Sequence, residues 1–116
     1  MLHFGNLSDD SLFAVDRRGF FIHCDDEQMD YIYAHHPELV NFWADENDMK
    51  FAIENANIIY QSSHGKDFNI YYLQKSGSNT ELKVVVKFQG EQGILYMAQP
   101  ISKRPDGEVM IWAKNH

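Results

Sequence analysis

The sequence predicts a single α+β domain, residues 1–116, with N-terminal helices packed on a four- to five-stranded antiparallel sheet. Apolar residues of the first half recur at the helical spacing of three and four, whereas beyond Asn57 they gather in short β-branched and aromatic runs. The connections between those runs are too short for the crossover helices that parallel strands need. With 44% hydrophobic residues, a chain of 116 residues can bury one modest core.

Two helices are predicted in the first half. Asp25, followed three residues later by Gln28, forms a variant capping box for the first helix. Its apolar face is spaced at i, i+3, i+4 and i+7: Met29, Ile32, Tyr33 and His36. Pro37 ends this helix, because the residue before proline is disfavoured in the α region. The second helix has one apolar face at the same spacing: Met49, Ala52, Ile53 and Ala56.

Short β-like runs lie on both sides of these helices. Runs 12–15 and 20–24 flank a turn in which Gly19 can supply the positive φ of a hairpin. The main strands are expected at 58–62, 69–73, 82–88 and 94–98, with an edge strand at 109–113. In strand 82–88, Leu82, Val84, Val86 and Phe88 alternate with Lys83, Val85 and Lys87, so helices should cover the first set and leave the second as a partly polar face.

The net charge of −7 is unevenly distributed along the chain. The first 56 residues hold 12 acidic residues against three basic ones, a net charge of −9, whereas the remainder carries +2. The overall charge disfavours long-range attraction of a polyphosphate, although the basic half can still offer phosphate a local site. The single cysteine, Cys24, cannot form an internal disulfide, and its acidic neighbours should raise its pKa and suppress the thiolate.

Several function classes are excluded by pattern. The N-terminus lacks the features of a signal peptide, and no apolar run approaches the roughly 20 residues that cross a bilayer, so a cytoplasmic location and no membrane role are expected. No cofactor or metal is predicted, because the histidines and Cys24 do not follow the ligand spacing of a structural zinc site. Gly90 and Gly93 lie between strands and do not form a phosphate loop.

Five motifs occur in a characteristic order along residues 21–114: HHPELV at 35–40, NANIIYQS at 55–62, YY at 71–72, LKVVVKF at 82–88 and GEVMIW at 107–112. In this order the chain resembles small phage- and island-borne proteins of the barnase, EndoU, colicin and RelE-like nuclease group. The resemblance implies a helical layer on an antiparallel sheet and metal-independent cleavage of RNA, with tRNA as one candidate, on the open sheet face.

Cleavage of RNA by its own 2′-hydroxyl requires a base, an acid and cations near the phosphorane. By the resemblance, His36 is the candidate acid or base, and its ordinary pKa of about 6.5 suits that role. Lys83 would stabilise phosphate charge and Tyr71 would donate a hydrogen bond. The candidate substrate-binding residues are His35, Lys87, Ser62, Lys103 and Arg104.

Several of these candidates also have a purely structural interpretation. His36 continues the apolar stripe of its helix, as a core or capping histidine does. Lys83 and Lys87 are typical of a half-exposed strand, and residues 103–107 are typical of a solvated turn. The chain also departs from the family pattern: His35 and Gln61 stand where relatives carry arginine, and Met97 stands where they carry threonine. Methionine cannot donate a hydrogen bond, and loss of a cation weakens transition-state stabilisation.

Two hypotheses therefore stay open. The first is a small ribonuclease, the toxin of a toxin–antitoxin pair or a mobile-element nuclease, with a cognate antitoxin or immunity protein as partner. The second is a catalytically degenerate protein of the same fold whose acidic surface binds or inhibits another protein. The acidic runs 25–27 with Asp30 and 45–46 with Asp48 favour the second, and they also fit stabilisation of helix N-termini by the macrodipole.

Overall fold

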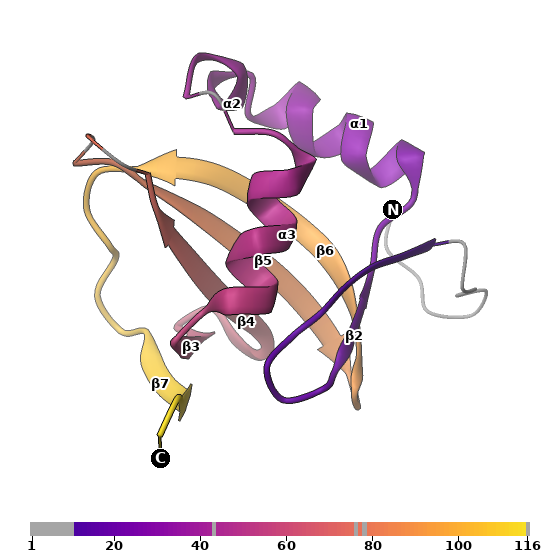
Figure 1. Ribbon diagram of the computed structural model, residues 1–116, viewed down its shortest axis with the longest axis vertical. Helices are drawn as coiled ribbons and strands as arrows, with labels where there is room; N and C mark the ends of the chain where they lie inside the picture. Colours follow the sequence, from indigo (N-terminus) through magenta and orange to yellow (C-terminus); the bar gives the residue numbers. More distant parts are fainter. Residues whose placement is uncertain (1–10, 43, 76, 78, 116) are drawn as a thin grey trace.

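The computed structural model describes residues 11–42, 44–75, 77 and 79–115. In this part of the chain, three helices lie against one face of a seven-stranded sheet (Figure 1). The helices follow a β-hairpin and precede the rest of the sheet. An α+β architecture is therefore confirmed, and the sheet has more strands than the sequence predicted.

Both predicted helices form, and their N-termini are capped by aspartates. α1 (Asp26–His35) begins where the Asp25 carboxylate accepts the N–H of Gln28 at 2.8 Å. The predicted capping box is only half formed, because the Gln28 amide donates instead to the carbonyls of Leu95 and Tyr96, both at 3.1 Å. This side chain therefore fastens α1 to the sheet.

The second predicted helix has a complete capping box. α3 (Glu46–Asn55) starts with reciprocal hydrogen bonds between Asp45 and Asp48, at 3.0 and 3.1 Å. Between α1 and α3 lies one short turn of helix, α2 (Glu38–Asn41), which the sequence did not predict. It follows Pro37 directly, and proline readily occupies the start of a helix because its missing N–H would have no partner there.

The sheet combines a meander with strands added at its two edges. In chain order its strands are β1 (Leu12–Val15), β2 (Phe21–His23), β3 (Ile58–Ser62), β4 (Gly65–Gln74), β5 (Glu81–Gln89), β6 (Gln92–Ile101) and β7 (Val109–Ala113). In space they are ordered β1-β2-β6-β5-β4-β3-β7. The antiparallel meander from β3 to β6 matches the prediction, as does β7 at an edge.

The prediction of a wholly antiparallel sheet is wrong at one place. β2 pairs in parallel with β6, which makes the sheet mixed. The helical layer lies in the chain between these two strands, so their parallel arrangement does not need a short crossover. The hairpin of β1 and β2 forms as predicted, and Gly19 in its turn has φ +88°, a conformation that glycine adopts without steric cost.

The two faces of the meander differ as the alternation in β5 predicted. Leu82, Val84 and Val86 are fully buried and belong to the core cluster that includes apolar residues of all three helices. Lys83 and Lys87 alternate with them and therefore point to the opposite side, which we call the open face. The core thus lies between the helices and the first set of side chains.

A buried carboxylate connects the hairpin to the middle of the sheet. Asp16, whose side chain is 0% exposed, accepts hydrogen bonds from the backbone of Arg18 and Phe20 at 2.9 and 3.1 Å. It also accepts from the Arg18 guanidinium at 2.7 Å and from the Tyr71 hydroxyl at 2.8 Å. Arg18 in turn donates to Asn69 at 2.8 Å. The turn of β1 and β2 is thereby fixed to β4.

Replacing Asp16 tests how much this network contributes to the free energy of unfolding. We expect Asp16→Ala to lower the free energy of unfolding by about 3–5 kcal/mol, because the largely buried Arg18 would lose its counter-ion. Denaturant unfolding followed by circular dichroism measures the change. Asp67→Ala, an exposed aspartate of β4, is the matched control. Equal stability of the two variants would contradict the central role of Asp16.

Candidate functional site

Polar side chains from distant segments meet on the open face, and we call them the open-face cluster. They come from β3, β4, β5 and the connection between β6 and β7: Tyr60, Tyr72, Glu81, Lys83, Arg104 and Glu108. The register explains the core of the cluster, because Tyr72 of β4 lies directly opposite Lys83 of β5 and directly opposed residues point to the same face.

An almost completely buried ion pair lies at the centre of the cluster. The Lys83 Nζ is 3.0 Å from Glu108 Oε2, and the two side chains are only 12% and 6% exposed. The other carboxylate oxygen, Oε1, accepts a hydrogen bond from the Tyr72 hydroxyl. Among the described residues, Oε2 receives no hydrogen bond of good geometry, so its stabilisation comes from the nearby ammonium charge. This carboxylate keeps one acceptor oxygen without a hydrogen bond.

Arg104 covers the tyrosines from the connection between β6 and β7. Its guanidinium binds Glu81 through two hydrogen bonds of 2.8 and 2.7 Å and donates to the Tyr60 hydroxyl at 3.0 Å. It also stacks 4.0 Å from the centre of the Tyr72 ring. The hydrogen bonds to Glu81 raise the pKa of Arg104, and burial followed by the bond to Glu108 raises the pKa of Tyr72. The arginine stays charged and the tyrosine stays protonated at neutral pH.

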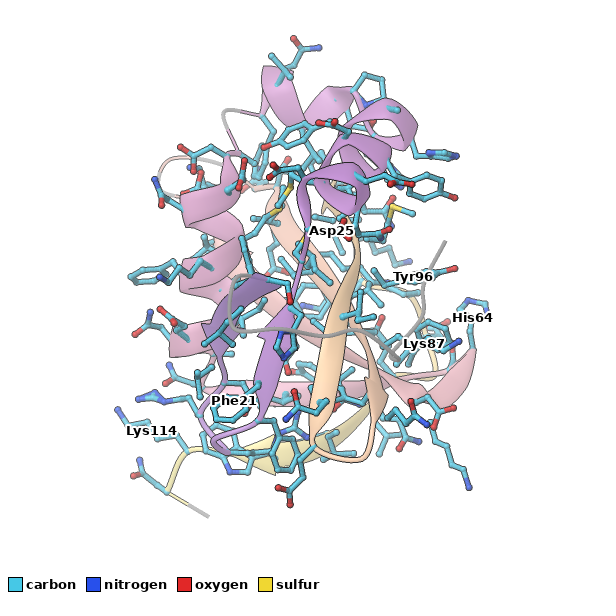
Figure 2. The ribbon with its side chains drawn as sticks, turned by 90° about the vertical axis from the view of Figure 1, so that its right-hand side faces the viewer. Phe21, Asp25, His64, Lys87, Tyr96 and Lys114 are labelled. Atoms are coloured by element: carbon cyan, nitrogen blue, oxygen red, sulfur yellow. The ribbon has the colours of Figure 1, made fainter. Side chains whose placement is uncertain are left out.

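A second group on the open face is aromatic and cationic. The Lys87 ammonium lies 5.6 Å from the centre of the Phe68 ring, and Phe68 contacts Tyr96 edge-on with centroids 5.0 Å apart. Figure 2 shows Lys87 and Tyr96, with His64, on the side of the sheet away from the helices. Aromatic faces beside a cation are suited to stack a base and neutralise a phosphate.

The structure does not bring the predicted catalytic residues together. His36 is the C-cap of α1, in the helical layer, and its Nδ1 is 3.1 Å from Glu38 Oε2. Lys83 points to the open face, so the sheet separates these two side chains. The pKa of Glu38 is lowered by its own backbone N–H and then by His36. The contacts of His36 are those of a residue that ends a helix.

Tyr71 also lies away from Lys83. It pairs with Val84 of β5, is 0% exposed in the core and donates its hydroxyl to Asp16. The tyrosine that reaches the open face is its neighbour, Tyr72. Successive residues of a strand point to opposite faces, and two adjacent tyrosines do not reveal in the sequence which one points outward.

The candidate substrate-binding residues are divided between several places. Lys87 and Arg104 share the open face with Lys83. His35 is exposed on α1, where its ring stacks on Tyr31 at 3.9 Å, and the Ser62 hydroxyl accepts the N–H of His64 at 3.0 Å in the turn after β3. Lys103 is exposed in the connection before β7. Only part of the predicted set therefore forms one site.

Sequence reasoning missed the two carboxylates of the cluster and the outward tyrosines. Glu81 lies two residues before Lys83, so period two within β5 could have placed both on one face. Glu108 had no such signal, because it reaches Lys83 from the connection that precedes β7. His35, Gln61 and Met97 depart from the pattern of the nuclease group that the sequence resembles. Of these three, Met97 pairs with Val85 and so lies on the open face, where its side chain is a thioether.

We also searched the described ranges for a metal site, a membrane-spanning helix and a reactive thiol. No group of three or more His, Cys, Asp or Glu side chains there is arranged to hold a metal ion, and no helix there is long and apolar enough to span a membrane. Burial raises the pKa of Cys24 to about 12, and Asp25, Glu46 and Asp26 add to the effect, so this thiol stays protonated at neutral pH.

Comparison with known proteins finds no match among family models, curated proteins or solved structures.

The buried Tyr71 gives stability a definite pH dependence. Burial, followed by the Asp16 charge, raises the pKa of Tyr71. A phenol whose pKa is raised by folding contributes stability that is fully present below its unfolded pKa of about 10 and is lost as pH rises toward the folded pKa. We expect the free energy of unfolding to decline above pH ~10, and to decline less steeply in Tyr71→Phe, which costs about 1–2 kcal/mol at neutral pH.

Urea unfolding between neutral and alkaline pH measures both quantities. Tyr72 is present in both proteins, so the difference in slope isolates Tyr71. Parallel pH profiles for wild type and Tyr71→Phe would show that this hydroxyl does not titrate with folding.

Proposed function

We propose that this chain is a metal-independent ribonuclease that acts on the open face, with Lys83 and Arg104 as its phosphate-binding cations. The observation that carries the proposal is the convergence of these two residues, from β5 and from the connection before β7, on one cluster with Tyr72 and Glu108. A carboxylate can act as the base in cleavage by the 2′-hydroxyl, and cations with a hydrogen-bond donor can stabilise the charge of the phosphorane.

Each residue of the cluster has a distinct role in the proposal. Glu108 takes the proton of the 2′-hydroxyl, whose oxygen attacks the adjacent phosphorus while the bond from phosphorus to the 5′-oxygen breaks. Lys83 and Arg104 neutralise the charge that grows on the phosphorane, and Tyr72 donates a hydrogen bond to it. The leaving 5′-oxygen takes a proton from water. The products are a 2′,3′-cyclic phosphate and a 5′-hydroxyl.

Substrate must first displace the contacts that close the cluster. Lys83 and Glu108 are nearly buried, whereas Arg104 is 40% exposed, so Arg104 is the group that RNA can reach first. A phosphate that replaces Glu81 on the guanidinium would preserve its two-pronged geometry, because guanidinium binds phosphate and carboxylate in the same way. The residues between β6 and β7 would move with Arg104 and expose the ion pair.

The aromatic group supplies a second contact for the same strand of RNA. Lys87 lies four residues beyond Lys83 on β5, about 13 Å away at roughly 3.3 Å per residue, and points to the same face. Phe68 and the exposed Tyr96 lie beside it. Base stacking there would favour single-stranded RNA over duplex, because stacked pairs hide the faces of their bases.

Cleavage of total RNA and purified tRNA in the presence of EDTA tests this function. We expect discrete fragments from wild type and a loss of about 10²–10³ in rate for Lys83→Ala, Arg104→Ala and Glu108→Gln. His36→Ala should keep its activity, because the sheet separates it from the cluster. Lys50→Ala, which removes an exposed cation on α3, is the control for loss of charge.

The variants also exclude a contaminating ribonuclease, which would cleave equally in every preparation. Activity that depends on His36 but not on Lys83 would move the site to the helical layer. Intact RNA over a wide range of protein concentration would overturn the enzyme proposal.

A second candidate function uses the opposite side of the molecule, where the three helices form the outer layer (Figure 1). We also propose that this layer binds a basic protein partner. Each helix exposes one large apolar side chain, Tyr31, Val40 and Phe51, and the helical layer also exposes carboxylates such as Asp26 and Asp30. Apolar anchors within a charged rim are the usual composition of a protein interface.

Phe51 provides the test of this surface. A partner is first captured with the wild-type protein from cells that contain it, and is then purified. It should bind Phe51→Ala at least about 30-fold more weakly than wild type, as expected for a hot-spot aromatic. Phe21→Ala removes a similarly exposed ring, 45% against 54% for Phe51, from β2 instead of the helices, and should bind as wild type does. A partner equally sensitive to both substitutions, or to neither, would not use the helical layer.

A further inference from the structure

β7 is an edge strand that carries exposed apolar residues. It pairs with β3 on one side, and no strand of the described chain pairs with its other side. Edges of monomeric proteins commonly carry charges or proline, which prevent pairing with another chain. β7 instead begins with three consecutive exposed apolar residues, Val109, Met110 and Ile111, which are 58%, 48% and 41% exposed.

This strand also lines a groove at the surface. An open groove of about 290 Å³ is lined by Met110, Ile111, Trp112 and Ala113. The register with β3 skips Ile111, because Trp112 pairs with Ile59 and Met110 pairs with Tyr60. The extra residue of such a bulge is not matched by the partner strand, so the backbone of Ile111 is left to other contacts.

The charges at the two ends of β7 favour an antiparallel copy of the same strand as its partner. The exposed Asp106 precedes the strand, and the exposed Lys114 follows it. An antiparallel second copy centred on Ile111 would bring the acidic end of each strand, with Asp106, toward the basic end of its partner, with Lys114. A parallel arrangement would place like charges together. The strand is therefore complementary to itself in charge and in apolar character.

We propose that two copies of this chain associate by antiparallel pairing of β7 with β7 about a twofold axis at Ile111. The contact is isologous, and it joins the two sheets into one. It involves a single short strand and so buries less than the roughly 1,200–2,000 Å² of a standard stable interface, which makes the dimer reversible and dependent on concentration. This inference does not depend on the proposed ribonuclease activity.

Sedimentation velocity over a range of protein concentration tests the association. We expect wild type to shift from monomer toward dimer as its concentration rises, and Ile111→Lys to weaken the dimer at least tenfold. Leu12→Lys makes the same change at an exposed residue of β1, the opposite edge of the sheet, and should leave the dimer unchanged. Circular dichroism confirms that each variant is folded.

A cysteine placed on the axis tests the register. In a Cys24→Ser background, Ile111→Cys should form a disulfide with its own copy under mild oxidation, because residues directly opposite each other have Cβ atoms about 4.5–5.5 Å apart. Val109→Cys would lie opposite Ala113 and should not cross-link. A wild-type protein that stays monomeric at every concentration, or one whose dimer is weakened equally by Leu12→Lys, would overturn the proposal.

Discussion

The buried carboxylate of Asp16 is the constraint on which the rest of this fold depends. The hairpin of β1 and β2 joins the sheet through only three paired residues of β2 and β6, a short ladder for a segment at the sheet edge. Asp16 accepts hydrogen bonds from its own turn and from Tyr71 in β4, and thus connects the edge to the centre of the sheet. A buried charge is tolerated only where such donors surround it. The hairpin must therefore lie where these donors can reach the Asp16 carboxylate.

The same constraint determines what appears on the far side of the sheet. Because Tyr71 must point inward to Asp16, its neighbour Tyr72 points outward, and the residue opposite Tyr72 is Lys83. A slip of one residue would exchange the faces and bury a lysine among the helices. The open-face cluster is therefore a consequence of the buried network, joined to it by strand alternation. Structural and candidate functional residues are adjacent in the chain here, although the sheet separates their side chains.

The sequence could predict the features that depend on neighbouring residues, but not those that depend on contacts between distant segments. Local patterns predicted α1, α3, the meander and the alternation in β5, because periodicity and turns are properties of neighbouring residues. The parallel pairing of β2 with β6, and the contact of Glu108 with Lys83, depend on segments far apart in the chain and left no local signal. Among the candidate site residues, the lysines of β5 and Arg104 lie on one surface of the structure. Tyr71 and His36 lie elsewhere, because a residue's face depends on the register and on the packing of helices.

The separation of His36 from Lys83 narrows the chemistry that this molecule can perform. A general base must come within about 3 Å of the proton it removes, whereas layers packed on a sheet lie about 10 Å apart. One phosphate therefore cannot contact both residues, and the chemistry proposed for Lys83 does not include His36. The two candidate functions then occupy opposite faces, RNA on the sheet and a protein on the helices. A partner bound to the helical layer would leave the open-face cluster accessible, so it could hold or deliver a ribonuclease without blocking it.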